Sequence, residues 1–315
     1  MLPEIAAGIA IVFVASLLFT DSVEYISFSR QWSRHFAGAV FTPIFTSIPE
    51  LTVLLLAVSQ DSISTGGSIA LGTVFGEPLF IVLISPVVLL IFSHSGMRGM
   101  TVESEASFPY LFISASFPLC IVPLLLHFRT VQLLEAPLLL LLYPLYLYLA
   151  PVSKKVAEPE NAPLFSRVTG RNWTAYIQLL LSISMLYGGS LLLVHNIPQL
   201  AIELHAPLLL VSMLTVPVAT VLPETAIGAI WASRGRNTLA FGALSGEGVL
   251  YCTFYPFLSL LLVQWSFSIH VLYTIIIVSL LSFLYFLSSR SGKVALWLPL
   301  AGLFFFIAFL FISFL

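Results

Sequence analysis

Charged residues are scarce in this sequence of 315 residues: they make up 8% of it, against 59% hydrophobic residues and a mean hydropathy of +1.06. A soluble domain carries about 25% charged residues, so this chain cannot cover its surface with groups that water solvates. The apolar runs are about 20 residues long, which suits membrane-crossing helices, whereas a transmembrane barrel needs alternating strands of about 10 residues. We therefore expect an all-α integral membrane protein.

Other features that the sequence lacks exclude further classes of function. Twelve Lys and Arg are balanced by fourteen Asp and Glu, which leaves no basic stripe for nucleic acid. There is no glycine-rich phosphate loop, no His-Glu-x-x-His or Cys-x-x-Cys pattern and no nucleophile–base pair, so we expect neither an enzyme nor a bound cofactor. Cys120 and Cys252 lie in apolar runs, where small buried side chains are expected rather than a disulfide. The N-terminus has no signal-peptide pattern, so its apolar run is expected to be a retained helix.

Ten apolar stretches are long enough to cross a bilayer. They cover residues 3–22, 36–59, 67–92, 107–127, 131–150, 174–196, 206–233, 238–263, 267–288 and 294–315. A long polar interruption separates the first five from the last five. The expected parts are a first five-helix repeat (1–150), a cytoplasmic linker loop (151–173) and a second five-helix repeat (174–315).

Basic residues are unevenly divided among the loops between these stretches. Arg129 is the one basic residue that follows an even-numbered span. The loops after the odd-numbered spans hold Arg30, Arg34, Arg98, Lys154, Lys155, Arg167, Arg171, Arg234, Arg236, Arg290 and Lys293. Basic loops stay in the cytoplasm, so both termini should face outward, and an odd number of spans in each half inverts the second half. This topology is typical of an inverted-repeat transporter, here expected in a prokaryotic plasma membrane.

The two halves also share residues that are costly inside a membrane. In spans two and seven the shared residues are Pro43, Thr46, Pro49 and Glu50 in the first half and Pro217, Thr220, Pro223 and Glu224 in the second. In spans three and eight they are Gly72, Gly76, Glu77 and Pro86, and Gly242, Gly246, Glu247 and Pro256. Apolar residues could align by chance, but a repeated set of Pro, Gly and Glu at the same spacing indicates an internal repeat.

These residues have physical consequences for a membrane helix. A proline removes an amide donor and frees the carbonyl four residues earlier, and a freed carbonyl in hydrocarbon needs a new partner, which a cation can provide. The carbonyls concerned belong to Ala39, Phe45, Met213 and Ala219. Glu50 and Glu224 then fall in the first turn of the helical segment beyond each interruption, where the helix dipole favours a carboxylate. The glycines allow close approach of neighbouring helices.

Four glutamates are thereby predicted near the middle of the membrane, in two symmetric pairs. An ionisable side chain there costs at least ~2.5 kcal/mol, and spans two, three, seven and eight contain no Lys or Arg to neutralise it. The predicted ligands are Glu50, Glu77, Glu224 and Glu247, with the hydroxyl groups of Thr46, Ser47 and Thr220. Oxygen ligands suit a hard cation such as Ca²⁺, Na⁺ or Mg²⁺. The threonines could instead hydrogen-bond back within their own helices.

The segments Thr-Ser-Ile-Pro-Glu at 46–50 and Thr-Val-Leu-Pro-Glu at 220–224 resemble signatures of the cation/Ca²⁺ exchanger superfamily. Gly72, Gly76 and Glu77 resemble the Gly-Asn-x-x-Gly-Ser-Asn motif of that family's next helix. The resemblance covers both repeats and implies an alternating-access antiporter of the prokaryotic Na⁺/Ca²⁺-exchanger type. It also implies that Thr46, Ser47, Glu50, Thr220 and Glu224 line the ion sites.

The sequence departs from that family pattern at several positions. Glu77 and Glu247 replace a serine, Ile81 and Tyr251 replace an Asn or Asp, and Val221 replaces a serine. Four clustered carboxylates cannot all stay ionised in an empty site, so cation binding could release protons as a coupled titration. The departures therefore leave both Na⁺ and H⁺ open as the coupling ion. Tyr251 and Cys252 are expected to serve packing.

Three classes of function are weighed against these observations. We favour a secondary antiporter that exchanges Ca²⁺, or another cation such as Mg²⁺ or Mn²⁺, for Na⁺ or H⁺. A cation channel is the alternative, but channels usually form their pore by oligomeric symmetry, whereas this pseudo-symmetric site is complete in one chain. A membrane enzyme is disfavoured for want of a catalytic pair. The expected partners are the transported cations and the lipid bilayer, with the chain acting as a monomer.

Overall fold

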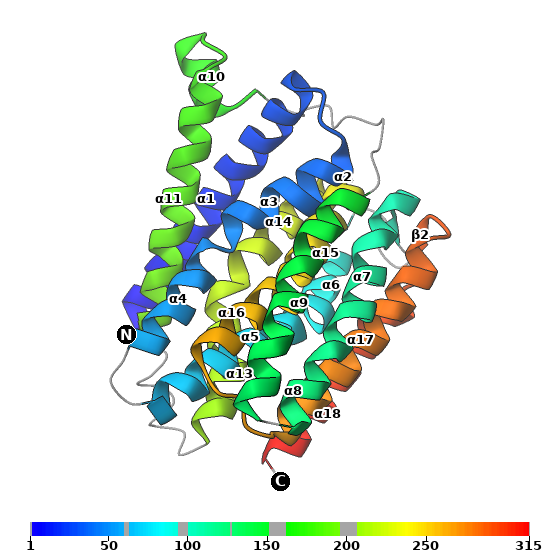
Figure 1. Cartoon of the computed structure of the whole chain (residues 1–315). Helices are drawn as coiled ribbons and strands as arrows, with labels where there is room; N and C mark the ends of the chain where they lie inside the picture. The colour runs from blue at the N-terminus through cyan, green and yellow to red at the C-terminus, as the bar shows by residue number, and fades with distance from the viewer. Residues whose placement is uncertain are drawn as a thin grey trace.

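The computed structural model of the chain describes residues 2–59, 63–93, 100–126, 128–150, 162–195 and 207–314. Nearly all of these residues are helical, and the longer helices run side by side in one bundle (Figure 1). A short antiparallel pairing of β1 (Met100–Thr101) with β2 (Lys293–Val294) joins two loops. The expected all-helical class is confirmed.

Several of the apolar stretches are divided into shorter helices. In the first half the elements are α1 (Leu2–Ser29), α2 (Arg34–Phe36), η1 (Ala37–Phe41), α3 (Thr42–Thr46), α4 (Ile48–Ser59), α5 (Ile63–Leu83), α6 (Ser85–Phe92), η3 (Ser104–Ser107), α7 (Phe108–Ser116), η4 (Phe117–Cys120), α8 (Ile121–Leu126) and α9 (Arg129–Leu149). In the second half they are α10 (Leu164–Thr169), α11 (Thr174–His195), α13 (Leu208–Thr220), α14 (Leu222–Ser233), α15 (Asn237–Cys252), α16 (Phe254–Leu262), α17 (Ile269–Ser289) and α18 (Trp297–Phe314). The boundaries between α3 and α4, α5 and α6, and α13 and α14 each precede a proline, which cannot donate to the helix.

Six helical stretches among the described residues are long and apolar enough to cross a membrane, judged by length and composition. They are Ala6–Ser29, Gly67–Phe92, Ser104–Leu126, Arg129–Leu149, Leu208–Ser233 and Ile269–Ser289. A shorter apolar helix covers Trp297–Ser313. The described parts of all ten predicted stretches are mostly helical, while the number of crossings and the inversion of the second half stay predictions.

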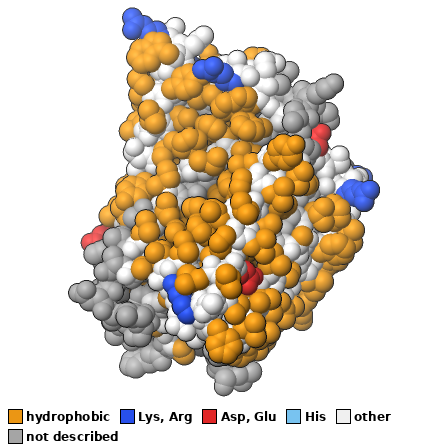
Figure 2. Space-filling view, viewed as in Figure 1, with side chains coloured by type: hydrophobic (Ala, Val, Ile, Leu, Met, Phe, Trp, Pro, Cys, Tyr) orange, Lys and Arg blue, Asp and Glu red, His pale blue; other side chains and the backbone are white. Residues whose placement is uncertain are grey.

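The surface that these helices leave exposed is apolar, as expected of a protein surrounded by lipid. Figure 2 shows hydrophobic side chains over most of the visible face, with few charged side chains among them. Phe304, Phe311 and Leu134 are each at least 66% exposed. Cys120 and Cys252 are free and buried, as predicted.

The first helix is longer than the sequence predicts. The apolar pattern ends at residue 22, but α1 continues to Ser29 and carries Asp21 and Glu24 with it. Arg234 lies 2.8 Å from the carboxylate of Asp21 and 3.8 Å from that of Glu24, which explains how acidic residues remain in a packed helix. Glu24 is buried in this arrangement.

The predicted linker 151–173 is partly helical. Residues 151–161 lie outside the described part of the chain, and α10 follows them. Gly170 ends this helix with a φ of 67°, a left-handed conformation that glycine adopts without steric cost.

The most buried helix is α15, whose residues are buried from Asn237 to Cys252. The pair α1 and α11 lies along one side of the bundle (Figure 1). Gly189 of α11 allows this approach, because a Cβ there would lie 2.8 Å from Val12 Cγ2 of α1. Gln178 of α11 also donates a hydrogen bond to the carbonyl of Leu18 at 2.9 Å. These contacts make α1 and α11 a packed pair beside the central helices.

Loops predicted to be cytoplasmic lie together at one end of the bundle. Arg34 contacts Glu103 at 3.3 Å, and the amide of Glu103 donates to Thr238 at 3.1 Å, which joins the loops after spans one, three and seven. The β1–β2 pairing adds the loop after span nine. Arg98 lies outside the described residues. These four loops therefore share an end, and the side of the membrane that they face stays a prediction.

Arg129, the one basic residue predicted at the opposite end, has a structural role there. Its guanidinium donates to the carbonyls of Leu260, Leu261 and Val263 at 2.6, 2.8 and 3.0 Å. Because α16 ends at Leu262, these are carbonyls that the helix leaves without amide partners. Arg129 thus caps the C-terminus of α16.

Candidate functional site

The two Pro-Glu segments adopt the same backbone conformation in the two halves of the chain. Ser47 separates α3 from α4 with φ −80° and ψ 5°, and Val221 separates α13 from α14 with φ −81° and ψ −8°. Glu50 and Glu224 are each the third residue of the helix that follows. The prediction that these carboxylates occupy the first turn after an interruption is confirmed.

The carbonyls that Pro43 and Pro217 were predicted to free lie against glycines of the opposite half. A Cβ on Gly246 would collide with the carbonyl of Ala39, and one on Gly76 would collide with the carbonyl of Met213. The expected close approach of these helices is therefore present, and it brings α15 onto η1 and α5 onto α13.

The carbonyl of Ala39 has a partner that the sequence did not predict. Tyr146 of α9 donates a hydrogen bond to it at 3.2 Å. The residues around it form a π-helical turn, η1, in which the Thr42 hydroxyl donates to the Ala37 carbonyl at 2.8 Å. A tyrosine hydroxyl group therefore serves as a partner of the Ala39 carbonyl in this structure, and a cation there stays a prediction.

The threonine of each half meets a glutamate of the other half. Thr46 Oγ1 lies 3.0 Å from Glu247 Oε2, and Thr220 Oγ1 lies 3.4 Å from Glu77 Oε1. Each threonine is also within reach of the carbonyl four residues earlier in its own helix, at 3.1 and 3.2 Å. The interpretation that the threonines hydrogen-bond back within their own helices is therefore confirmed, while their role as cation ligands stays a prediction. The same contacts bring the two helix pairs together.

All four glutamates are buried without any exposed surface. Thr46, Ser47 and Thr220 are buried beside them. Among the described residues, no Lys or Arg forms an ion pair with any of the four carboxylates. The carboxylates are near enough to interact electrostatically: Glu224 with each of the others, and Glu77 with Glu50 and Glu247. The site is thus a sealed cluster of acidic groups without basic partners.

Several oxygens of this cluster have no hydrogen-bond partner among the described residues. They are Glu50 Oε2, Glu77 Oε2, Glu224 Oε1, Glu224 Oε2 and Glu247 Oε1. A buried carboxylate oxygen without a donor is costly unless a proton or a cation satisfies it. These oxygens are therefore able to accept a further partner, and a positively charged ligand would bind through them.

Two tyrosines of the second half complete the first half of the site, and sequence reasoning missed both. Tyr251 donates a hydrogen bond to Glu50 Oε1 at 3.0 Å, and Tyr255 donates to the carbonyl of Ser47 at 2.6 Å. The expectation that Tyr251 serves packing alone is wrong. Its position, where the exchanger motif has Asn or Asp, was the signal in the sequence that could have identified it.

The carboxylates do not form a ready chelate by themselves. No group of three His, Cys, Asp or Glu side chains in the described part of the chain is arranged to hold one metal ion. A cation in this cluster would therefore need hydroxyl or carbonyl oxygens as further ligands, or a movement of the glutamate side chains toward it. Such adjustable oxygen sites are usual for hard cations that are bound and released.

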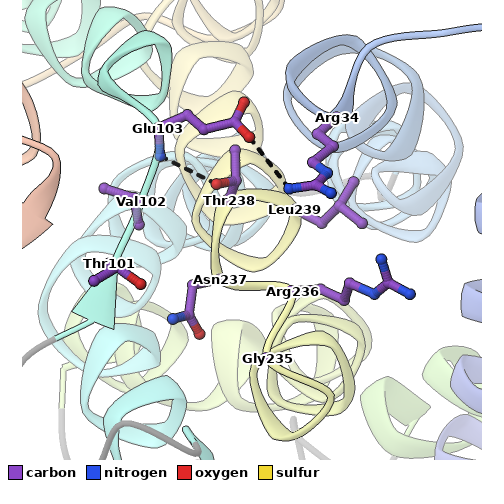
Figure 3. A pocket seen from close by; sticks show the side chains of 9 residues that line it. All are labelled: Arg34, Thr101, Val102, Glu103, Gly235, Arg236, Asn237, Thr238 and Leu239. Atoms are coloured by element: carbon purple, nitrogen blue, oxygen red, sulfur yellow. Dashed lines mark hydrogen bonds and ion pairs between the residues drawn. The ribbon is translucent and has the colours of Figure 1, made fainter. Parts of the chain in front are cut away.

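A separate cleft lies among the loops at the basic end of the bundle. It has a volume of about 220 Å³ and is lined by Arg34, Thr101, Val102, Glu103, Gly235, Arg236, Asn237, Thr238 and Leu239. Figure 3 shows the Arg34–Glu103 contact and the Glu103–Thr238 hydrogen bond at its edge. None of its lining residues is a predicted site residue, so it is distinct from the glutamate cluster.

Comparison with known proteins supports the resemblance found in the motifs. The chain matches the sodium/calcium exchanger protein family over residues 4–151 and 174–315, which is nearly its whole length. CaxA of Alkalimonas amylolytica, a protein named as an antiporter, is 24% identical over 260 residues, which cover 78% of this chain and 75% of that protein.

Solved structures of the sodium-calcium exchanger NCX_Mj share the fold. The structure soaked with 100 mM Na⁺ and 10 mM Sr²⁺ superposes with a TM-score of 0.72 at 19% identity and covers 98% of this chain and 96% of that one. The structure soaked with neither Na⁺ nor Ca²⁺ has the same TM-score and coverage at 16% identity. With the family matched over both halves of the sequence, the chain belongs to the sodium/calcium exchanger protein family and is a transmembrane ion antiporter.

Proposed function

We propose that the protein is a secondary active antiporter that exchanges Ca²⁺, or a related divalent cation, for Na⁺ or H⁺ at the glutamate cluster. The observation that carries this proposal is the set of five unpartnered carboxylate oxygens in a buried cluster that has no basic neighbour among the described residues. A cation that enters would neutralise charge that nothing else in the cluster compensates. The match to an exchanger family and to a relative named as an antiporter supports the same function.

The class of cation follows from the available donor atoms. Glu50, Glu77, Glu224 and Glu247 supply carboxylate oxygens, and Thr46, Ser47 and Thr220 supply hydroxyl oxygens. This set suits hard cations such as Ca²⁺, Mg²⁺ and Mn²⁺ rather than softer metals that prefer thiolate or imidazole. The cation is the transported substrate, not a resident cofactor.

The coupling ion is either Na⁺ or H⁺. Glu77 and Glu247 occupy positions where the resembled motif has a neutral serine, so they add two groups that can exchange a proton for a cation. If they couple transport to H⁺, protons leave the cluster when the divalent cation enters. If Na⁺ is the coupling ion, the same carboxylates act as additional ligands.

We further propose that the chain consists of two inverted five-helix repeats, 1–150 and 174–315, in a prokaryotic plasma membrane. The crossed Thr46–Glu247 and Thr220–Glu77 contacts and the two separately matched segments support this division. The helix pair α1 and α11, packed along one side, would slide or rock against the central helices and open the cluster alternately to each side. The chain would act as a monomer, since both halves of the site come from it.

A cation channel is the alternative function. A channel needs a continuous path, whereas the four carboxylates have no exposed surface in this structure. This burial favours alternating access over an open pore.

The test is uptake of ⁴⁵Ca²⁺ into liposomes that contain the purified protein. An outward Na⁺ gradient and an outward H⁺ gradient are applied separately, with Glu50→Gln and Glu77→Gln measured alongside. Uptake driven by one gradient and lost in Glu50→Gln supports the proposal, and loss of H⁺-driven uptake in Glu77→Gln makes Glu77 a coupling group. If neither gradient drives Ca²⁺, Mg²⁺ or Mn²⁺, antiport is refuted. Uptake without saturation or counterflow would identify a channel.

A further inference from the structure

The two halves of the glutamate cluster are alike in backbone but differ in how many of their oxygens are already occupied. In the first half, Glu50 Oε1 accepts a hydrogen bond from Tyr251, and the Ser47 carbonyl accepts one from Tyr255. In the second half, neither oxygen of Glu224 has a hydrogen-bond partner among the described residues. This difference has a definite origin in the sequence.

The repeat places different residues at the two equivalent positions. Counted from the repeated Gly-Glu pair, Tyr251 corresponds to Ile81, which has no hydroxyl group, and Tyr255 corresponds to Ser85. The Ser85 hydroxyl lies 2.7 Å from the hydroxyl of Thr225, so it does not serve as a donor to the Val221 carbonyl in the way that Tyr255 serves Ser47. Both tyrosines therefore contact the Pro-Glu segment of the first half, and the equivalent positions of the repeat offer the second half no such donors.

We infer that Tyr251 determines the size preference of the cation site, because its hydroxyl group keeps Glu50 from binding a cation through both carboxylate oxygens. This inference rests on the proposed cation site. Tyr251 is a positioning residue here: it holds one oxygen of Glu50 and leaves Oε2 for the ion. Tyr255 reinforces the effect by occupying the Ser47 carbonyl.

The physical reason lies in coordination number. Larger divalent cations take up to eight oxygen ligands and often bind a carboxylate through both oxygens, whereas small cations prefer six ligands in a regular arrangement. A site in which Glu50 offers one oxygen and Ser47 offers no free carbonyl has fewer ligands to give. It therefore favours a smaller divalent cation over a larger one. The preference is stronger than it would be in a site where Glu50, like Glu224, had no tyrosine donor.

The hydrogen bond is rigidly supported. Tyr251 and Tyr255 are both fully buried, and their rings pack against each other with centroids 5.4 Å apart. Tyr255 also packs edge-on against Phe254 at 5.7 Å. Because the rings are held by packing, replacing either tyrosine with phenylalanine removes the donor and keeps the shape.

The test is competition between cations during ⁴⁵Ca²⁺ counterflow in liposomes at one fixed pH. Counterflow needs no knowledge of the coupling ion. The concentrations of Mn²⁺ and of Ba²⁺ that halve exchange are measured for the wild type and for Tyr251→Phe. We expect the Mn²⁺/Ba²⁺ preference to shift toward Ba²⁺ by about tenfold, the effect of releasing a hydrogen bond to a charged group, and Tyr255→Phe to shift it in the same direction by a smaller factor.

The matched control is Tyr285→Phe. Tyr285 is equally buried, its hydroxyl has no hydrogen-bond partner among the described residues, and it belongs to α17. Its variant should leave the preference unchanged. If Tyr251→Phe weakens both ions equally, or changes neither, the inference is overturned, since the tyrosine would then be an ordinary ligand or a packing residue. If Tyr251→Phe does not fold, an unchanged preference in Tyr255→Phe overturns it. A wild type without counterflow of any of these ions refutes the proposed function instead.

Discussion

Thr46 Oγ1 lies 3.0 Å from Oε2 of Glu247, a residue 201 positions further along the chain. The equivalent pair, Thr220 and Glu77, is related to it by the internal repeat and has a separation of 3.4 Å. Each half of the chain therefore orients a glutamate of the other half. Neither half can present a complete site alone, because the threonine and the glutamate of each pair come from different halves.

Replacing Thr46 with valine tests this relationship. Valine keeps the shape and removes the hydroxyl group that donates to Glu247 Oε2. We expect the KM for ⁴⁵Ca²⁺ uptake to rise about tenfold, since a hydrogen bond to a charged group contributes about 1.5–3 kcal/mol. The control is Thr274→Val in α17, whose buried hydroxyl has no partner in the described structure. Equal KM values for the two variants would show that Thr46 does not act on Glu247.

Replacing Gly246 with alanine tests the close packing of α15 against η1. The added Cβ would overlap the carbonyl of Ala39, and backbone cannot move aside as a side chain can. We expect thermal stability in detergent to fall by the equivalent of about 1–3 kcal/mol, the usual effect of overpacking. Gly188→Ala in α11 is the matched control, because no atom of the described residues lies within 4 Å of its added Cβ. That variant should be neutral or stabilising, because alanine favours a helix, and a loss of similar size there would contradict the packing argument.

Replacing Arg129 with glutamine removes the cap from α16. Three carbonyls at the end of that helix lose a charged donor. Charge interactions at a helix C-terminus contribute up to about 2 kcal/mol, so the melting temperature in detergent should fall by several degrees. Arg171→Gln, at an exposed position before α11, should leave the melting temperature unchanged. A drop of the same size in both variants would indicate a general effect of charge rather than a helix cap.

The burial of His35 should make the stability of the protein depend on pH. It lies in α2, directly before the span expected at 36–59, and neither ring nitrogen has a hydrogen-bond partner in the described structure. Burial lowers its pKa from 6.5 to about 4, with Glu105 opposing the shift in part. The unfolded chain therefore binds more protons between these values, so stability should fall as pH drops from about 6.5 to about 4, by up to about 3 kcal/mol.

Thermal unfolding of the wild type and of His35→Leu across this pH range checks that expectation. Above pH 7 the histidine is neutral in both the folded and the unfolded state, so each protein's own melting temperature there is its reference. The variant should lose less stability on acidification than the wild type. An identical acid loss in the two proteins would assign the effect to other groups.

Much of the site could be predicted from the sequence because proline, glycine and glutamate are rare in membrane helices for physical reasons. Glu50 and Glu224 fall in the first turn after an interruption because Pro49 and Pro223 fix where the next helix begins. The glycines adjacent to Glu77 and Glu247 indicated close helix contacts, and Gly76 and Gly246 make them. The structural effects of such residues are local, so they can be predicted without knowing which distant residue packs against them.

The rest could not be predicted because it depends on which distant side chain arrives at a given atom. Tyr251 looked like a packing residue and nothing in the sequence singled out Tyr255. Only the folding of α15 and α16 against α3 and α4 brings their hydroxyl groups to Glu50 and Ser47. The same holds for Tyr146, which satisfies the Ala39 carbonyl from α9. A hydropathy pattern also could not show that Arg234 would compensate Asp21 and allow α1 to continue.

Equilibrium binding of ⁴⁵Ca²⁺ to the purified protein in detergent tests the glutamate site most directly. We expect saturable binding to the wild type, lost in Glu50→Gln and in Glu224→Gln, and retained in Glu4→Gln, which alters a carboxylate in the first turn of α1. Saturable binding that survives the simultaneous replacement of Glu50, Glu77, Glu224 and Glu247 with glutamine would contradict the claim that these four residues form the transport site.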